Sequence, residues 1–197
     1  MDSRELELQA VEGALAGAPV EPERLARLAR LLGYDERLLL HLRRYQGPWR
    51  TRLARLLTAA GDARSWSAVA LALLAVGRRP AVHLGLRVGL GALAGALAAQ
   101  VLKRSLSRAR PTSAIVGFEA LADDPDAFSF PSGHTTAAFA VAVAVGGEPY
   151  CAGPLALLLA TGIGLSRVYL GAHYPLDVVV GGLLGAAAGA GTRLLVP

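Results

Sequence analysis

The later two thirds of the chain carry few charges, and this limits what the chain can fold into. Of the 20 basic and 15 acidic residues, 11 basic and 9 acidic ones lie in residues 1–64. The remainder contains long runs of Ala, Leu, Val and Gly, and the whole chain is 53% hydrophobic with a mean hydropathy of +0.43. A soluble domain needs less apolar surface than this. The composition therefore predicts an all-α integral membrane protein.

Five apolar segments are candidates for crossing a bilayer. A helix rises about 1.5 Å per residue, so about 20 residues span the hydrocarbon core. The expected crossings are residues 64–76, 83–102, 133–147, 152–170 and 173–196, of which the first is short and must recruit flanking residues. Glycines recur one turn apart in the second and fifth segments, where they let helix backbones approach closely. We therefore expect a compact bundle of about five transmembrane helices.

The N-terminal part of the chain has a different pattern. Residues 21–60 carry leucines at helical spacing with arginines between them. This pattern is typical of amphipathic helices that lie on a membrane surface, where Tyr34, Tyr45 and Trp49 can anchor them at the headgroups. The sequence therefore divides into a membrane-surface segment, residues 1–62, and a transmembrane core, residues 63–197.

The formal net charge of +5 raises the question of an anionic partner. The arginines lie between acids or beside apolar runs, without interleaved aromatic residues or a nucleic-acid-binding motif. We therefore expect membrane lipids, and no nucleic acid, as the partners of this charge.

Polar residues gather at three helix ends. Lys103, the only lysine of the chain, and Arg110 follow the second expected crossing, where a basic membrane anchor is an alternative explanation. Ser132, Gly133 and His134 open the third crossing. Amide groups at a helix N-terminus favour an anion there, although an ordinary helix cap has the same residues.

The third group is Arg167, His173 and Asp177. His173 and Asp177 are four residues apart, so their side chains share one helix face. A carboxylate that binds one imidazole nitrogen leaves the other nitrogen to act as a base or nucleophile, whereas an isolated pair of this kind is more often structural. Alternating crossings bring all three groups to the same side of the membrane. Together they describe a site for a doubly charged tetrahedral oxyanion, with a nucleophile and an acid beside it.

The spacing within these groups resembles a known family. Residues 103–111 read Lys, six residues, Arg-Pro; residues 131–134 read Pro-Ser-Gly-His; residues 166–177 read Ser-Arg, five residues, His, three residues, Asp. This order resembles the three-part signature of the type 2 phosphatidic acid phosphatases (PAP2). The sequences of the motifs are similar to those of compact bacterial integral-membrane lipid phosphatases. The similarity does not extend to residues 1–60, and membrane members of the family commonly have six crossings.

The resemblance implies an enzyme, a hydrolase that removes a phosphomonoester or diphosphate from a lipid through a phosphohistidine intermediate. His173 would attack phosphorus with Asp177 orienting it, and His134 would protonate the departing alkoxide and then activate water. No cofactor or metal would be needed, because protein groups would hold the phosphate oxygens: Lys103, Arg110, Ser132, Gly133 and Arg167.

Several alternatives stay open at this level. The lipid could be phosphatidic acid, phosphatidylglycerophosphate, a polyprenyl phosphate or diphosphate, or a lipid A type phosphate. A related pocket that holds vanadate would give a haloperoxidase, against which the short apolar chain argues. A non-catalytic membrane scaffold or anion transporter would keep the bundle, but the complete set of catalytic residues argues against it.

The orientation in the membrane follows from the basic residues. With five crossings, the N-terminal segment and the predicted site lie on the same side, and most arginines are there. The positive-inside rule then favours a multi-pass protein of the cell (inner) membrane with a cytoplasmic active site, while a periplasmic or extracellular site is the alternative that the family offers. Residues 112–130, between the first two motifs, are expected to form either a lid over the headgroup or a solvated loop.

Overall fold

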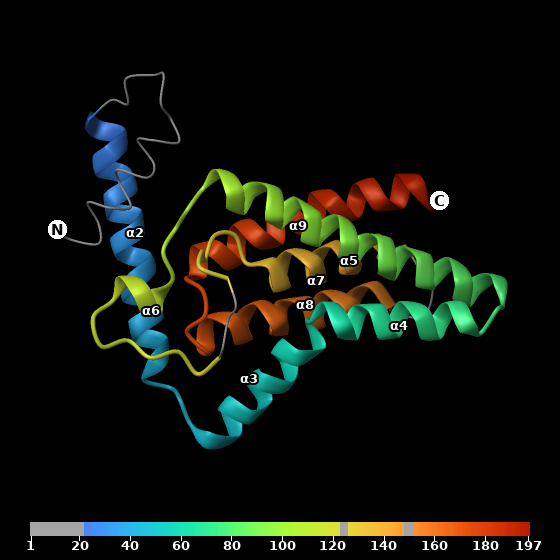
Figure 1. The fold of residues 1–197 in the computed structure, drawn as a ribbon, viewed down its shortest axis with the longest axis horizontal. Helices are drawn as coiled ribbons and strands as arrows, with labels where there is room; N and C mark the ends of the chain where they lie inside the picture. Colours follow the sequence, from blue (N-terminus) through green and yellow to red (C-terminus); the bar gives the residue numbers. More distant parts are fainter. Residues whose placement is uncertain (1–21, 123–125, 148–151) are drawn as a thin grey trace.

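The computed structural model describes residues 22–122, 126–147 and 152–197 (Figure 1). Within these residues every regular element is a helix, apart from an isolated bridge between Ala109 and Phe128. The helices are α2 (Pro22–Arg43), α3 (Pro48–Ala60), α4 (Ala63–Ala75), α5 (Arg79–Ser105), α6 (Pro111–Ala114), α7 (Gly133–Ala144), α8 (Ala152–Tyr169) and α9 (Pro175–Leu195). The predicted all-α class is confirmed.

Helices α4, α5, α7, α8 and α9 run side by side and form the bundle (Figure 1). Each corresponds to one of the five expected crossings. Within the described residues, three of them, α5, α8 and α9, are long and apolar enough to cross a membrane, and α4 and α7 are shorter apolar helices. The short α7 lies at the centre and packs against α5, α8 and α9. This position explains why α7 is apolar on nearly all sides.

Close backbone contacts hold the central helix. A Cβ atom on Gly185 or Gly189 of α9 would collide with backbone carbonyl oxygens of α7. On the opposite side, a Cβ on Gly95 of α5 would lie 2.8 Å from the Cα of Ala137. Since dispersion contacts between closely packed backbones are a main attraction between helices in lipid, these glycines allow α5 and α9 to approach α7 closely. The glycine spacing in the sequence therefore marks real helix contacts.

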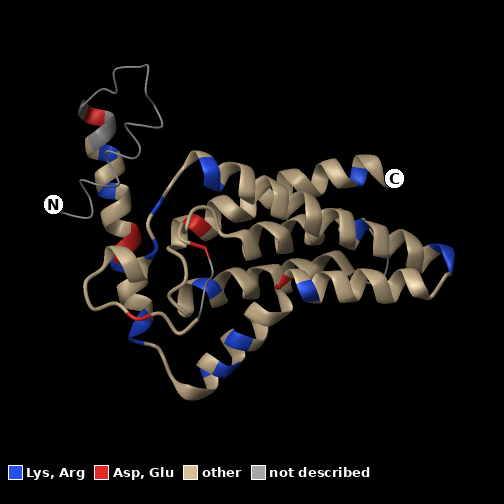
Figure 2. Cartoon of the chain, viewed as in Figure 1, with Lys and Arg blue, Asp and Glu red and all other residues tan. Residues whose placement is uncertain are grey.

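The first two helices of the described residues, α2 and α3, lie at one end of the bundle. Helix α2 runs across the direction of the bundle helices, and α3 slants from α2 to the start of α4 (Figure 1). Lys and Arg residues are frequent on α2 and α3, while the bundle carries few (Figure 2). Leu39 of α2 is fully buried in a cluster with Phe118, Val168 and Tyr174. This apolar cluster fixes α2 against the end of the bundle where α8 ends and α9 begins.

Candidate active site

One cavity of about 340 Å³ lies at the end of the bundle that α2 and α3 cover. Its polar lining comes from the end of α5, the start of α7 and the loops that precede α6, α7 and α9, and it includes five of the eight predicted site residues: Lys103, Arg110, Gly133, His134 and His173. Ser132, Arg167 and Asp177 are buried in the surrounding protein. Segments distant in the sequence thus supply one polar chamber, as the alternation of crossings predicted.

The start of α7 is shaped by backbone and hydroxyl contacts. The Ser132 amide donates a hydrogen bond to the Asp177 carbonyl over 3.1 Å, which ties α7 to α9. Thr135 donates to the Ser132 hydroxyl over 2.9 Å. Ser132 is the N-cap residue of α7, but its side chain makes no capping bond. These contacts place the first turn of α7, with Gly133 and His134, at the cavity wall.

The orientation of His173 differs from the sequence expectation in one respect. Its Nδ1 lies 2.7 Å from the Ser129 carbonyl oxygen and 3.7 Å from Asp177 Oδ2. A carbonyl only accepts, so the ring carries a proton on Nδ1 and the lone pair on Nε2. The backbone of Ser129 therefore makes the orienting hydrogen bond, and the Asp177 carboxylate adds a negative charge behind it.

The charge state of His173 follows from its surroundings. Burial lowers the pKa of its imidazole, and the positive charges of Arg167 and Arg110 act in the same direction, while Asp177 opposes them. The result is a neutral ring at neutral pH. A neutral imidazole with its lone pair on Nε2 is the form that can act as a nucleophile.

Asp177 belongs to a buried charge network that the sequence did not reveal. Arg108 Nη1 donates to Asp177 Oδ1 and to Asp35 Oδ2, each over 2.8 Å, and the guanidinium lies 3.9 Å from the centre of the Tyr174 ring. Asp35 also accepts a hydrogen bond from the Leu176 amide at the start of α9. Burial raises the pKa of Asp35, and the bond from Arg108 opposes that effect. Helix α2 thus contributes a carboxylate that is linked through Arg108 to the group behind His173.

A second carboxylate, from Asp126, enters the cavity itself. Lys103 Nζ lies 2.7 Å from Asp126 Oδ2, and Arg110 Nε donates to the Asp126 carbonyl over 2.6 Å. The hydrogen bond from Lys103 lowers the pKa of this carboxyl group, so it is ionised at neutral pH. The segment of residues 112–130 therefore reaches the site at Asp126, while residues 123–125 lie outside the described part of the chain. An anion that binds Lys103 competes with this carboxylate for the ammonium group.

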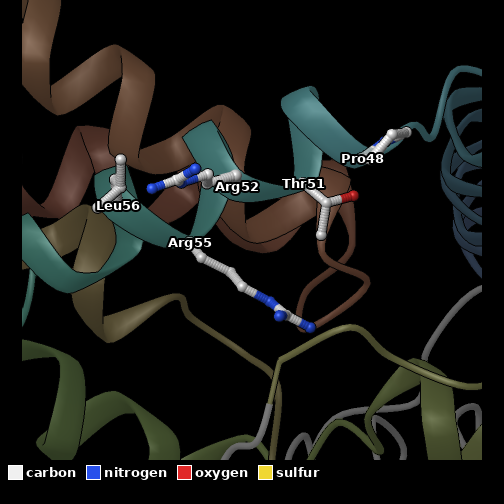
Figure 3. A pocket seen from close by; sticks show the side chains of 5 residues that line it. All are labelled: Pro48, Thr51, Arg52, Arg55 and Leu56. Carbon is white, nitrogen blue, oxygen red and sulfur yellow. The ribbon is translucent and has the colours of Figure 1, made fainter.

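A larger hollow, of about 560 Å³, lies elsewhere on α3 (Figure 3). It is lined by Pro48, Thr51, Arg52, Arg55 and Leu56 and contains none of the predicted site residues. The side chains of its two arginines point in different directions (Figure 3). Arg55 Nη2 donates to the Leu121 carbonyl over 3.3 Å. These arginines do not converge on one ligand, so we assign the chemistry to the smaller cavity.

In residues 22–122, 126–147 and 152–197, no three His, Cys, Asp or Glu side chains are grouped so that they could hold a metal ion. The titratable side chains that line the cavity are two cations, Lys103 and Arg110, one carboxylate and two imidazoles. Two cations and two imidazoles in one cavity suit a tetrahedral anion.

Comparison with known proteins identifies the family. Residues 84–197, more than half of the chain, match the PAP2 superfamily. The chain therefore belongs to the PAP2 superfamily, which confirms the family indicated by the three motifs.

Relatives and solved structures agree with this placement. The chain is 39% identical over 102 residues to the decaprenylphosphoryl-5-phosphoribose phosphatase of Mycobacterium tuberculosis (strain ATCC 25618 / H37Rv), a match that covers 52% of this chain and 55% of that protein. The matched region thus spans little more than half the length of that relative. LpxE of Aquifex aeolicus has 26% identity and a TM-score of 0.67, with 79% of this chain and 92% of the other covered. A phosphatidylglycerolphosphate phosphatase from Bacillus subtilis shares the fold, with a TM-score of 0.71, 22% identity and coverage of 98% and 94%.

Proposed function

We propose that the protein is a membrane lipid phosphatase that hydrolyses a phosphomonoester or diphosphate of a lipid through a phosphohistidine. The observation that carries this proposal is the composition of the cavity of about 340 Å³. One end holds Lys103, Arg110, His134 and His173, and the remainder is lined by apolar side chains of α4 and α5 together with a few small polar ones. A molecule with an anionic head and an apolar tail matches both parts of this lining.

The first chemical step uses both histidines. His173 Nε2 attacks phosphorus, so that an N–P bond forms while the bond from phosphorus to the lipid oxygen breaks. His134 gives its proton to the departing alkoxide. The backbone carbonyl of Ser129 keeps the other nitrogen of His173 protonated, which directs the lone pair at the substrate. In the second step His134 takes a proton from water, the hydroxide attacks phosphorus, and the N–P bond breaks to release phosphate.

The phosphate oxygens carry more negative charge in the transition state than before it. Lys103, Arg110 and Arg167 supply positive charge, and the Ser132 hydroxyl and the Gly133 amide donate hydrogen bonds at the N-terminus of α7. Removing one such preorganised donor typically costs about 10² to 10³ in rate. Since these groups supply the charge, the reaction needs no metal ion or other cofactor.

Among lipid phosphates, we propose a substrate with a single long chain, such as a polyprenyl phosphate or diphosphate. A cavity of about 340 Å³ has room for a headgroup and the first part of one chain, with the rest of the lipid outside it. The relative from M. tuberculosis is named for a decaprenylphosphoryl compound, which also supports this choice. Phosphate release from a panel of polyprenyl phosphate, phosphatidic acid and phosphatidylglycerophosphate, in detergent and without added metal, ranks the substrates. Equal or faster release from the two-chain lipids would contradict the single-chain proposal.

The assignment of the nucleophile predicts that His173→Ala reduces phosphate release by at least about 10³-fold, because losing a nucleophile removes the covalent route. His83→Ala is the matched control, since this histidine lies at the other end of α5 and bonds to the C-terminal Pro197. The measurement is release of inorganic phosphate from the purified variants, with thermal unfolding to establish that both are folded. A His173→Ala variant within a few-fold of wild type would refute the assignment.

The apolar part of the cavity predicts a selective effect of Ala96→Phe. Ala96 lines the cavity from α5, and a phenyl ring there fills the space that we assign to the lipid chain. We expect KM for a long-chain lipid phosphate to rise at least about tenfold, the order expected when several buried CH₂ contacts are lost. Hydrolysis of p-nitrophenyl phosphate, which has no chain, should stay unchanged. Ala68→Phe, on the exposed face of α4, is the control for adding the same ring. An unchanged lipid KM in Ala96→Phe would place the chain elsewhere.

We also propose that α2 and α3 lie on the membrane surface at the active-site end. Their direction across the bundle, their arginines and three exposed aromatic residues, Tyr34, Tyr45 and Trp49, support this (Figures 1 and 2). Trp49 is 65% exposed in the protein and would insert at the headgroup level. In nanodiscs, lipids brominated near the headgroup should quench Trp49 fluorescence in a Trp66→Phe background. Lack of quenching by any brominated lipid would contradict surface placement.

We place the active-site end on the cytoplasmic side of the cell membrane. The basic residues of α2, α3 and the segment 103–110 lie at that end, whereas Arg78 and Arg79 lie at the start of α5 and Arg193 lies in the last turn of α9, at the other end. The positive-inside rule supports this orientation. A cysteine introduced at the exposed Ser107, in a Cys151→Ala background, should resist a membrane-impermeant thiol reagent in intact cells and react after lysis. Labelling in intact cells would place the site on the outer side.

A further inference from the structure

We infer that Asp62 is a positioning residue for His134, the acid and base of the proposed reaction. The inference rests on the proposed function and extends it to a residue outside the PAP2-matched region, which begins at residue 84. His134 Nε2 lies 2.7 Å from Asp62 Oδ1. The two residues are 72 positions apart in the sequence, and they meet because the junction between α3 and α4 lies against the first turn of α7.

The Asp62 carboxylate is directed at the imidazole rather than at its own helix. Asp62 occupies the N-cap position of α4, yet its side chain makes no capping hydrogen bond. An aspartate at this position ordinarily accepts a bond from an amide in the first turn. Asp62 and His134 side chains are 48% and 25% exposed, so the pair lies at the edge of the cavity and not in its buried floor.

The backbone beside Asp62 is held tightly in place. A Cβ on Gly61 would lie 2.7 Å from the Ile163 side chain and 3.4 Å from His134 Cδ2, so only glycine allows this approach. The indole of Trp66 donates to the Gly61 carbonyl over 3.1 Å. One turn earlier, the Thr58 hydroxyl lies 2.8 Å from that of Ser166. These contacts from α8 and α4 fix the junction, so the carboxylate reaches His134 from a defined direction.

The electrostatic surroundings of His134 explain why it needs a carboxylate. Lys103 and Arg110 line the same cavity, and both disfavour a third positive charge on an imidazolium. His173 is neutral in its resting form, and Asp126 is already paired with Lys103. Asp62 is therefore the carboxylate in contact with His134 that favours the protonated ring, which is the form required to donate a proton to the leaving alkoxide.

The contact also determines which proton moves. With Asp62 at Nε2, the hydrogen on that nitrogen stays in the hydrogen bond throughout the cycle. The proton delivered to the alkoxide is then the one on Nδ1, and the ring is left neutral with Nε2–H still donating to Asp62. In the second step Nδ1 takes a proton from the attacking water, which restores the imidazolium.

The test compares two leaving groups in the full-length protein in detergent. For an alkyl lipid phosphate, Asp62→Asn should lower kcat/KM by about 10- to 100-fold, because the alkoxide needs a proton. For p-nitrophenyl phosphate, whose nitrophenolate leaves without protonation, the loss should stay below about threefold. The alkaline limb of the lipid profile should move to lower pH by about one unit, since an opposite charge that favoured the imidazolium is lost. Asp62→Glu should restore most of the activity.

Glu119→Gln is the matched control, because Glu119 is an exposed acid at the same end of the molecule and its removal changes the net charge equally. It should leave both substrates and the pH profile unchanged. An Asp62→Asn variant that loses activity equally on both substrates without a shift in pH profile would mean a merely structural role, and one that matches wild type would mean no role. Either result overturns the inference. A wild-type protein that releases phosphate from neither substrate overturns the proposed function instead.

Discussion

The arrangement of the active-site end depends on one guanidinium that two buried carboxylates share. Arg108 donates to Asp35 and to Asp177, each over 2.8 Å, and stacks on Tyr174. A buried charge is costly unless it is paired, so separating α2 from the bundle would take Asp35 away from Arg108 and from the Leu176 amide, both of which bind it. The pairing therefore fixes α2, the segment after α5 and the start of α9 relative to one another. His173 lies beside this junction, so its position depends on the same contacts.

Much of the fold could be predicted from the sequence, because the membrane allows few solutions. Apolar runs of sufficient length have to be helices, and consecutive helices have to alternate in direction. Alternation alone places Lys103, His134 and His173 at the same end of the bundle, and the structure brings them to one cavity. The glycine spacing of α9 likewise corresponds to its contact with α7. These features were predictable because each follows from a local pattern and one global constraint.

The carboxylates around the site could not be predicted, because their roles arise only from tertiary contacts. Asp35 lies in an amphipathic helix among arginines, and an acid in such a helix is predicted to lie on its solvent-exposed face. Asp62 precedes an apolar helix, so its position predicts an ordinary N-cap residue. Asp126 is one of several acids in a loop. The Ser129 carbonyl that orients His173 is a backbone atom, and backbone atoms leave no trace in the identity of a residue.

Asp126 also affects which anions can bind at Lys103, because its carboxylate occupies the same ammonium group. Unpaired cations in a partly buried cavity are costly, and the Asp126 carboxylate compensates Lys103 when no phosphate is bound. A doubly charged phosphate group attracts the ammonium group more strongly than a single carboxylate does, so it competes with Asp126 better than a ligand with one carboxylate would. Because Lys103 lowers the pKa of Asp126, the carboxylate stays ionised through the neutral range. Exchange at Lys103 in the neutral range therefore does not depend on protonation of Asp126.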